Sequence, residues 1–324
     1  MINKVKAIVY TKYGTPDVLQ LKEAEKPVPG DHEVLVKVHA ASINSWDWDM
    51  VRGKPFVVRM WGLFKPKYKI PGCDISGKVE AIGKNVKKFK PGDEVYGDMC
   101  QSGFGAFAGY KCARENALAL KSPAMSFEEA AAIPQAAMMA VQSIRDKMQI
   151  QPGQKLLING AGGAVGTFAV QIAKLYGAEV TGVDSGGKFE MMRSIGFDHV
   201  IDYKKEDFTK NSKCYDFILD VRTDRSIFSY TRVLCRHGTY VTVGGSLPLI
   251  LLSLFLRPWV SLFRKKHYSM VAMKANKDLA YMNELFETGK VKPVIHGTYK
   301  LDEVPEAFRL FCSGVQKGKI VITM

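Results

Sequence analysis

The stretch Leu156-Leu-Ile-Asn-Gly-Ala-Gly-Gly-Ala-Val-Gly166 decides the fold of this 324-residue chain. An apolar strand pattern runs into a glycine-rich turn, which leads directly into an amphipathic helical pattern over 165–176. Glycines permit the tight turn and let the backbone approach a pyrophosphate, whose charge is met by N–H groups at the helix N-terminus. A glycine-rich turn without a ligand is the alternative, but the flanking strand and helix favour a dinucleotide site. The predicted contacts are Gly160, Ala161, Gly162, Gly163, Ala164 and Val165.

Strand and helix patterns alternate after this turn. Apolar runs of strand length are separated by helical patterns, which is the rhythm of a parallel, doubly wound sheet. The sequence therefore predicts an α/β domain of the Rossmann type. Its expected strands are 155–159, 179–184, 199–202, 217–221 and 239–243, and its expected helices are 165–176 and 188–195.

The region before the turn has a different sequence pattern. From Val5 to about Leu120, short apolar runs are punctuated by Pro-Gly and Gly-Asp turns, which indicates a mostly β region. Ser126 followed by Glu129 is typical of the start of a helix. We therefore expect a domain hinge near this point.

The end of the chain is expected to return to the first domain. A helix is predicted at 278–288, and strands are predicted near Val294 and at 319–323. We assign 1–125 and 276–324 to the mostly β domain, and 126–275 to the dinucleotide-binding domain.

The composition is that of an ordinary globular protein, with 47% hydrophobic and 24% charged residues. A net charge of +14 suits an anionic partner, but the lysines are spread along the chain. A local group such as Lys84, Lys87, Lys88 and Lys90 is either a basic patch or a solvated loop surface. The sequence has no helix-turn-helix, zinc-finger or stacked-aromatic pattern, so we predict no nucleic-acid partner.

Two features predict the compartment. The first thirty residues lack the pattern of a signal peptide, and no window has the roughly 20 apolar residues that a bilayer span needs. The six cysteines are scattered without paired spacing, which fits reduced thiols better than a disulfide framework. We therefore expect a cytoplasmic protein.

The residues after the second strand of the dinucleotide domain bear on the choice of coenzyme. Asp184 stands where an acidic residue commonly accepts the ribose hydroxyls of NAD. Ser185, Lys188 and Tyr203 are donors suited to the 2′-phosphate of NADP, and Lys188 supplies the positive charge. The alternatives without a coenzyme contact are an N-cap for Ser185, a solvated helix lysine for Lys188 and a half-buried packing tyrosine for Tyr203. NADP is favoured over NAD, without a decision between them.

Two further stretches carry a resemblance to a known family. Pro71-Gly-Cys-Asp-Ile-Ser-Gly-Lys-Val-Glu-Ala-Ile-Gly83 and Val86-Lys-Lys-Phe-Lys-Pro-Gly-Asp-Glu-Val-Tyr-Gly97 resemble the N-terminal signature of the medium-chain dehydrogenase/reductases. The stretches from Ile201 to Phe208 and from Tyr215 to Val221 resemble quinone-oxidoreductase-like members. The resemblance covers essentially the whole chain. It implies a GroES-like, mostly β catalytic domain beside the Rossmann domain, and a homodimer.

The resemblance also bears on whether this chain could hold the catalytic zinc ion of alcohol dehydrogenases. The positions that hold catalytic zinc in alcohol dehydrogenases correspond to Asn44, Cys73 and Gln135. One thiol and two amides do not make a zinc site, because zinc takes Cys, His or carboxylate ligands. The four-cysteine structural zinc lobe is also missing, since only Cys100 and Cys112 lie in that region. We predict a metal-independent enzyme in which Cys73 is a small buried packing residue rather than a reactive thiol.

Without a metal to polarise a carbonyl, conjugated acceptors are the easier substrates. We predict hydride transfer from NAD(P)H to a quinone or an α,β-unsaturated carbonyl, with the enolate charge stabilised by hydrogen bonds. By resemblance, Asn44 faces the nicotinamide and the substrate, Asp47 lies on the same loop, and Trp46 and Trp48 form an apolar wall. Asn44 could equally cap a helix or turn, and Asp47 could be a solvated loop carboxylate.

The nicotinamide end is predicted from the strands that close the sheet. Val221, Gly244 and Gly245 are assigned there by resemblance, with a plain turn as the alternative for the two glycines. Met139 departs from the family pattern, since a threonine or serine often stands at this position.

The apolar segment 249–263 lines the substrate cleft, packs at a dimer interface or, less favoured, lies on a membrane surface. The competing hypothesis is a coenzyme-binding, membrane-associated scaffold with little catalytic activity. The physiological substrate, a small molecule, is not identified by the sequence.

Overall fold

The computed structural model describes residues 4–244, 248, 251–252, 255 and 265–324. The chain forms two compact units, which we call unit 1 (Met1–Met138 with Lys274–Met324) and unit 2 (Met139–Met273). Unit 1 extends beyond residue 125 because helix α2 (Phe127–Ala131) packs on its sheet, where Ala131 and Ala132 share a small core with Ala40 and Val321.

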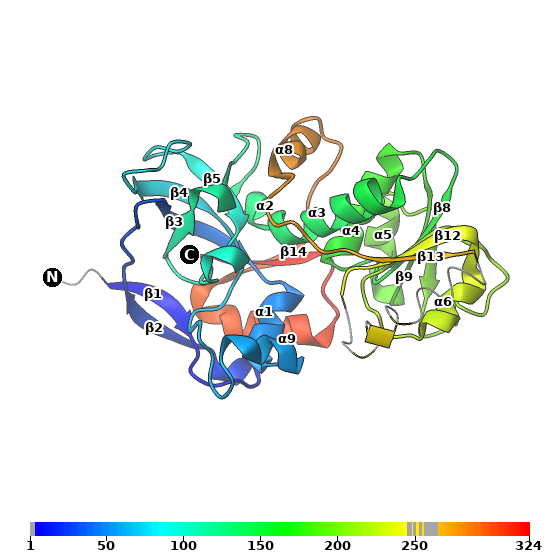
Figure 1. Cartoon of the computed structure of the whole chain (residues 1–324), viewed down its shortest axis with the longest axis horizontal. Coiled ribbons are helices and arrows are strands. Elements are labelled where there is room, and N and C mark those ends of the chain that lie inside the picture. Colours follow the sequence, from blue (N-terminus) through cyan, green and yellow to red (C-terminus); the bar gives the residue numbers. More distant parts are fainter. Residues whose placement is uncertain (1–3, 245–247, 249–250, 253–254, 256–264) are drawn as a thin grey trace. The chain divides into compact units, whose positions relative to one another are not determined.

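Unit 1 is built on a seven-stranded sheet in which most neighbours are antiparallel (Figure 1). The strand order is β14-β15-β3-β4-β5-β7, β6 also pairs with β3, and β1 and β2 form a separate ribbon. Its core is apolar and includes Val36, Ile75, Phe107 and Phe308. The strands are β1 (Lys4–Val9), β2 (Gln20–Glu25), β3 (Glu33–Ser42), β4 (Asp74–Ile82), β5 (Glu94–Asp98), β6 (Tyr110–Arg114), β7 (Ala119–Leu120), β14 (Ile295–Lys300) and β15 (Lys319–Thr323).

The end of the chain returns to unit 1, as predicted. Strand β15 pairs antiparallel with β3, with Val321 opposite Ser42, and Ile43 N donates to Ile320 O at 3.0 Å. This pairing places a residue from the end of the chain, Lys319, beside the residues that follow β3. The α-helices of this part are α1 (Ser45–Arg52), α2, α3 (Pro134–Val141, which runs past residue 138), α8 (Leu279–Glu287) and α9 (Val304–Ser313).

The predicted helix start at Ser126 is confirmed. Its side chain accepts a hydrogen bond from Glu129 N at 3.1 Å, and Ser126 N donates to the Glu129 carboxylate at 2.9 Å. Short 3-10 helices complete unit 1: Pro16–Val18, Phe56–Trp61 (η2), Cys100–Ser102 (η3), Glu115–Ala117 and Leu301–Glu303.

Unit 2 is a six-stranded parallel sheet in the order β10-β9-β8-β11-β12-β13, so the predicted doubly wound sheet is confirmed. The helix expected at 188–195 forms as an α-helix over Phe189–Ser194, preceded by a 3-10 turn over Gly186–Lys188. The strands are β8 (Lys155–Asn159), β9 (Glu179–Asp184), β10 (His199–Asp202), β11 (Tyr215–Asp220), β12 (Leu234–Thr242) and β13 (His267–Met270). The helices are η5 (Gln142–Met148, a π-helix), α4 (Ala164–Leu175), η6 (Gly186–Lys188), α5 (Phe189–Ser194) and α6 (Ile227–Val233).

One disulfide corrects the prediction of reduced thiols. Cys214, just before β11, is bonded to Cys235 at the start of β12. The sequence concealed this pair because the two residues are 21 positions apart and meet only through the parallel pairing of the strands. Cys73, Cys100, Cys112 and Cys312 are free thiols.

Two predictions fall partly or wholly on residues that the structure does not describe. Gly245 lies outside the described residues, and so does most of the apolar segment 249–263. Within the described part of the chain, no helix has the length and apolar character needed to cross a bilayer.

Candidate active site

Five predicted coenzyme residues of unit 2 follow the carboxyl ends of its strands. Gly160 comes directly after β8, Asp184 ends β9 and Tyr203 follows β10. Val221 follows β11, and Gly244 lies just after β12. Because neighbouring strands of this sheet are parallel, these ends share one edge. Open α/β sheets bind their ligands at this edge.

The first N–H groups of the glycine-rich turn already have hydrogen-bond acceptors within unit 2. The N–H groups of Gly160 and Ala161 donate to Val183 O at 3.0 and 3.1 Å. Gly162 N donates to Asp184 Oδ2 at 2.9 Å, and Gly163 N donates to Gly160 O at 3.2 Å. Four of the amides predicted to receive a pyrophosphate are thus engaged within unit 2.

The donors suited to an anion lie one step further along, in the first turn of α4. N–H groups at the start of a helix have no intrahelical acceptor, and the helix dipole adds partial positive charge there. Gly163 is the N-cap of α4, and Ala164, Val165 and Gly166 form its first turn. We therefore limit the predicted phosphate donors to the N–H groups in the first turn of α4. The preceding glycines form the turn that leads into this helix.

Asp184 and Lys188 form a buried ion pair beside the turn. Lys188 Nζ lies 3.2 Å from Asp184 Oδ1, and the side chains are 7% and 10% exposed. Ser185 N donates to the same oxygen at 2.8 Å. A Cβ at Gly162 would lie 2.6 Å from Lys188 Cδ, so glycine makes room for the pair. The two side chains predicted to favour opposite coenzymes are therefore bound to each other.

Ser185 and Tyr203 flank this pair. Ser185 precedes η6 but makes no capping hydrogen bond with its side chain. Tyr203 is 47% exposed, and its N–H donates to Asp184 O at 3.3 Å. Ser185 thus holds the N-cap position of η6 without a side-chain cap, and Tyr203 is about half-buried, so the structure contradicts neither alternative.

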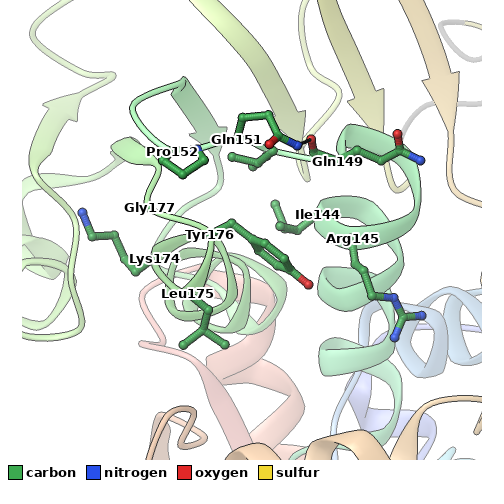
Figure 2. Close-up of a pocket in the computed structure, with 10 residues that line it drawn as sticks. Ile144, Arg145, Gln149, Gln151, Pro152, Lys174, Leu175, Tyr176 and Gly177 are labelled. Carbon is green, nitrogen blue, oxygen red and sulfur yellow. Dashed lines mark hydrogen bonds between the residues drawn. The ribbon is translucent and has the colours of Figure 1, made fainter.

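A pocket of about 650 Å³ lies at the other end of the same sheet (Figure 2). It is lined by Gln151 and Pro152, which precede β8, and by Tyr176 and Gly177, which precede β9. These segments enter the amino ends of the strands, opposite the edge that carries the glycine turn. This pocket is therefore not the predicted coenzyme site.

In unit 1, the predicted site residue Asn44 belongs to a group of side chains around one buried carboxylate. Asp74 accepts hydrogen bonds from Asn44 Nδ2 at 2.9 Å, Ser42 Oγ at 3.2 Å and Gln135 N at 3.2 Å. Lys319 Nζ lies 3.2 Å from the same carboxylate, and both side chains are fully buried. We call Ser42, Asn44, Asp74, Gln135 and Lys319 the Asp74 cluster.

The cluster fixes the orientation of the Asn44 amide. Lys319 Nζ donates to Asn44 Oδ1 at 2.7 Å, while Asn44 Nδ2 donates to Asp74 Oδ2. An amide nitrogen carries two hydrogens, so one N–H is used by Asp74 and the second is left for another acceptor. Asn44 is 6% exposed and therefore offers this N–H from a nearly enclosed position.

Asp47 is neither on a loop, as predicted, nor a solvated carboxylate, as the alternative had it. It belongs to α1 and is fully buried, and its Oδ2 accepts a hydrogen bond from Asn44 N at 2.8 Å. Burial raises the pKa of Asp47 to about 7, against the opposing influence of the Cys73 thiol and the Asn44 N–H. Asn44 is accordingly the N-cap of α1, as the alternative interpretation proposed.

The predicted wall of two tryptophans is divided. Trp46 packs against the small apolar cluster of Met50, Val58, Cys73 and Phe104, and meets Trp61 edge to face at 6.0 Å. Trp48 packs instead against Phe308 in the core of unit 1, with ring centroids 6.2 Å apart. Residues two positions apart on a helix point to nearly opposite sides, so only Trp46 lies beside the cysteine.

Cys73 is packed against a second thiol and a carboxylate. Cys100 Sγ lies 3.0 Å from Cys73 Sγ, and Cys100 N donates to Asp98 Oδ1 at 2.8 Å. Gln135 Nε2 approaches Cys100 Sγ at 3.6 Å. Burial raises the pKa of Asp98 to about 6, with repulsion from Asp74 adding to the effect, and burial raises the pKa of the Cys73 thiol. We call Cys73, Asp98 and Cys100 the Cys73 cluster.

The three positions at which relatives hold zinc are brought together, but their chemistry does not suit that ligand set. Asn44 and Gln135 present amides that are bonded to Asp74, Lys319 and Cys100. Only Cys73 supplies a ligand that zinc prefers.

Sequence reasoning missed Asp74 and Lys319 altogether and set Cys100 aside. Asp74 stands within the stretch that carries the family resemblance, directly after Cys73. Lys319 opens an otherwise apolar strand, so a cation at the first position was the available signal. Its partners lie 245 and 275 residues away in the sequence, a distance no local pattern spans.

Comparisons with known proteins agree with this architecture. Residues 30–142 match the alcohol dehydrogenase GroES-like domain, and residues 195–322 match the zinc-binding dehydrogenase family. The chain is 34% identical over 338 residues to a 2-methylene-furan-3-one reductase of Solanum lycopersicum, covering 99% of this chain and 79% of the relative. It is 30% identical over 331 residues to the chloroplastic quinone-oxidoreductase QR1 of Triphysaria versicolor, covering 98% of each.

A solved structure extends the agreement to the backbone. The quinone oxidoreductase from Coxiella burnetii superimposes with a TM-score of 0.88 at 26% identity, covering 99% of this chain and 100% of that one. The predicted fold class, a GroES-like unit joined to a Rossmann unit, is confirmed.

Proposed function

Because the chain belongs to the quinone-oxidoreductase-like branch of the medium-chain dehydrogenase/reductases, we propose that it is an NAD(P)H-dependent reductase of quinones or α,β-unsaturated carbonyls. The names of its relatives support this substrate class. In the proposed reaction no metal ion takes part. The bound reduced nicotinamide would supply the hydride, and the protein would hold the acceptor and stabilise the charge that develops on its oxygen.

The observation that carries the proposal is the fixed amide of Asn44. Lys319 and Asp74 hold its oxygen and one of its hydrogens, so the side chain cannot turn over. The remaining N–H is a preorganised donor for an enolate or phenolate oxygen. One such donor is worth about 3 to 4 kcal/mol in enzymes that stabilise an oxyanion. This donor supports reduction without a Lewis acid.

We propose a positioning role for Asp47. Its carboxylate receives the backbone N–H of Asn44 and so fixes the residue that carries the amide. It is buried within α1, and its contacts support an action through Asn44 rather than through direct contact with the acceptor.

For the coenzyme we propose NADPH in preference to NADH. Asp184 already accepts hydrogen bonds from Gly162 and Ser185 and pairs with Lys188, so its capacity to accept ribose hydroxyls is largely used. Lys188 adds a positive charge, and Tyr203 offers an exposed hydroxyl at the same edge. A 2′-phosphate would suit these two donors.

Calorimetric titration of both coenzymes tests this preference. We expect Lys188→Ala to weaken NADPH binding by about 10-fold or more, the usual effect of losing a charge-assisted hydrogen bond, and to change NADH binding little. Asp184→Ala is expected to shift the preference further toward NADPH. An unchanged preference in Lys188→Ala would mean that the phosphate contact is assigned to the wrong residue.

The reductase activity itself is tested by following NADPH and NADH oxidation with a panel of quinones, enals and enones. Asn44→Ala should lower kcat by about 100- to 1,000-fold with every acceptor, whereas Asn85→Ala, at an exposed position, should not. Absence of turnover with all acceptors would remove the catalytic proposal. Dependence of turnover on added zinc would remove its metal-independent part.

One observation favours a second candidate function, a coenzyme-binding scaffold at a membrane with little activity. The described residues of the apolar segment, Leu251, Leu252 and Phe255, are 57%, 44% and 83% exposed. Flotation with anionic liposomes separates the two functions. Strong binding that falls with salt, together with negligible turnover, would favour the scaffold.

The location and assembly stay proposals of the same kind. We propose a cytoplasmic homodimer, although the Cys214–Cys235 disulfide is a pairing that cytosolic proteins rarely keep. Cell fractionation tests the compartment, and analytical ultracentrifugation tests the dimer.

A further inference from the structure

Three side chains of unit 1 that can bind a metal converge at a largely buried position. The ligand atoms of Cys73, Asp98 and Cys100 lie within 4.8 Å of one another. Cys73 and Asp98 are fully buried, and Cys100 is half-buried at the start of η3. We propose that this Cys73 cluster binds one thiophilic divalent cation, such as Zn²⁺ or Cd²⁺.

A second observation points to a missing ligand. Asp98 Oδ2 is buried and has no hydrogen-bond partner among the described residues, whereas Asp98 Oδ1 accepts from Cys100 N. The nearby Asp47 Oδ1 is likewise buried without a partner. A buried carboxylate oxygen left unpaired costs several kcal/mol, so native proteins rarely keep one without a compensating group. A cation at the cluster supplies that group for Asp98.

The spacing of the two thiols fits one tetrahedral ion. With Zn–S bonds of about 2.3 Å and a tetrahedral angle, the two sulfur atoms must be about 3.8 Å apart. They are 3.0 Å apart without a metal, so the pair opens by less than about 1 Å on binding. The three protein ligands leave the fourth position of the shell open.

Binding replaces protons by the metal. Cys73 and Cys100 are free thiols in the structure. The ion takes both as thiolates and Asp98 as a carboxylate, so two thiol protons leave to solvent and no electrons are transferred. The bound dication then offsets the negative charges of its ligands.

This ligand set is distinct from the one that relatives use for zinc. It shares Cys73 with that set but replaces the amides of Asn44 and Gln135 by Asp98 and Cys100. The inference goes beyond the proposed reductase, in which the metal has no part. Metal binding and coenzyme oxidation are therefore measured separately, and either can fail without the other.

The test begins with the unaltered full-length chain, stripped with a chelator and handled without oxygen, so that the free thiols stay reduced and the Cys214–Cys235 disulfide stays closed. Titration with Cd²⁺ should show one ion per chain, a thiolate-to-cadmium charge-transfer band in the ultraviolet, and release of about two protons near pH 7. X-ray absorption of the Zn²⁺-loaded chain should show two sulfur atoms in the metal's coordination shell. A shell of nitrogen and oxygen alone, or no stoichiometric binding, overturns the proposal.

Variants then assign the ligands. Cys73→Ser and Cys100→Ser should each weaken Cd²⁺ binding by about 100-fold, because a hydroxyl is a poor substitute for a soft thiolate. Asp98→Asn should weaken Zn²⁺ binding by about 10-fold. Cys112→Ser and Cys312→Ser, free thiols outside the cluster, are the matched controls. Unchanged binding in Cys100→Ser, with circular dichroism showing a folded chain, overturns the assignment.

Discussion

Two buried carboxylates, one in each unit, are held in different ways. Asp184 in unit 2 has partners on both oxygens: Gly162 N on one, and Ser185 N with Lys188 on the other. Asp98 in unit 1 has Cys100 N on one oxygen, while the other has no partner among the described residues. The first site is complete within its own unit, and the second keeps the capacity to bind something more.

The two units also differ in how their sites are assembled. The partners of Asp184 lie within 22 residues of it in the sequence, in the glycine-rich turn and in the turn that follows β9. The residues around Asn44 and Cys73 come from strands and helices far apart in the chain. A locally built site is closed by short-range hydrogen bonds, whereas the site in unit 1 depends on long-range pairing of β15 with β3.

The largest expected effect is the loss of the long-range cation. Lys319→Ala leaves Asp74 buried without its ion-pair partner, which should reduce the free energy of unfolding by about 3 to 5 kcal/mol. Lys188→Ala should reduce it by only about 1 kcal/mol, because the Asp184 side chain is 10% exposed and water can replace the lysine, whereas the Asp74 side chain is fully buried. Thermal unfolding of both variants, with the exposed Lys290→Ala as control, measures the contrast. Equal losses would abolish the distinction between the units.

A steric change should disturb the closed site of unit 2. In Gly166→Ala, the added Cβ would lie 2.4 Å from Ala161 O, which is backbone and cannot swing away. We expect a loss of about 3 kcal/mol in stability, at the upper end for overpacking, and weaker coenzyme binding. Gly163→Ala is the matched control, since its Cβ would meet nothing closer than Gly160 O at 3.4 Å. Chemical denaturation and calorimetry distinguish the two.

A milder change should leave a buried carboxylate oxygen of unit 2 without its hydrogen-bond donor, which is the situation of Asp98 in unit 1. Asp220 is fully buried, and its Oδ2 accepts a hydrogen bond from Tyr240 OH at 2.7 Å. Tyr240→Phe removes that donor, so we expect a loss of about 2 kcal/mol in stability. Tyr203→Phe, at a half-exposed position, should change the melting temperature little. A harmless Tyr240→Phe would show that an unpartnered buried oxygen says less about a missing ligand than we infer for Asp98.

The smallest expected effect concerns pH. His39 stacks on Phe127 with ring centroids 4.3 Å apart, and burial, with repulsion from Lys37, lowers its pKa. The unfolded chain therefore takes up the proton at a higher pH than the folded chain, and stability falls as pH drops below about 6.5. His39→Gln should flatten this fall between about pH 7 and 5. Melting curves across that range check it, and a slope equal to that of the unaltered chain would contradict it.

Local patterns predicted much of the fold. The strand, glycine turn and helix around Gly160 form as expected, and so does the helix start at Ser126, because each depends on neighbours in the sequence. The return of strand 319–323 to the first unit was also predicted, and its pairing with β3 confirms it.

The rest required contacts that no pattern encodes. Asp47 was expected on a loop, but its burial depends on the helix that Asn44 caps. Cys214 and Cys235 meet only because β11 and β12 pair, and Cys100 lies beside Cys73 only because β4 and β5 pair. The use of the glycine-turn amides was hidden for the same reason, since their acceptor, Val183, lies on the next strand.

The placement of Lys319 has a consequence for synthesis on the ribosome. Asn44 and Asp74 emerge early, but the cation that holds them follows 275 residues after Asn44, beyond the whole of residues 139–273. The Rossmann half of a nascent polypeptide can thus mature while the GroES-like half still waits for its buried lysine. A chain interrupted between these two events would carry a finished unit 2 and a unit 1 that still lacks its buried cation.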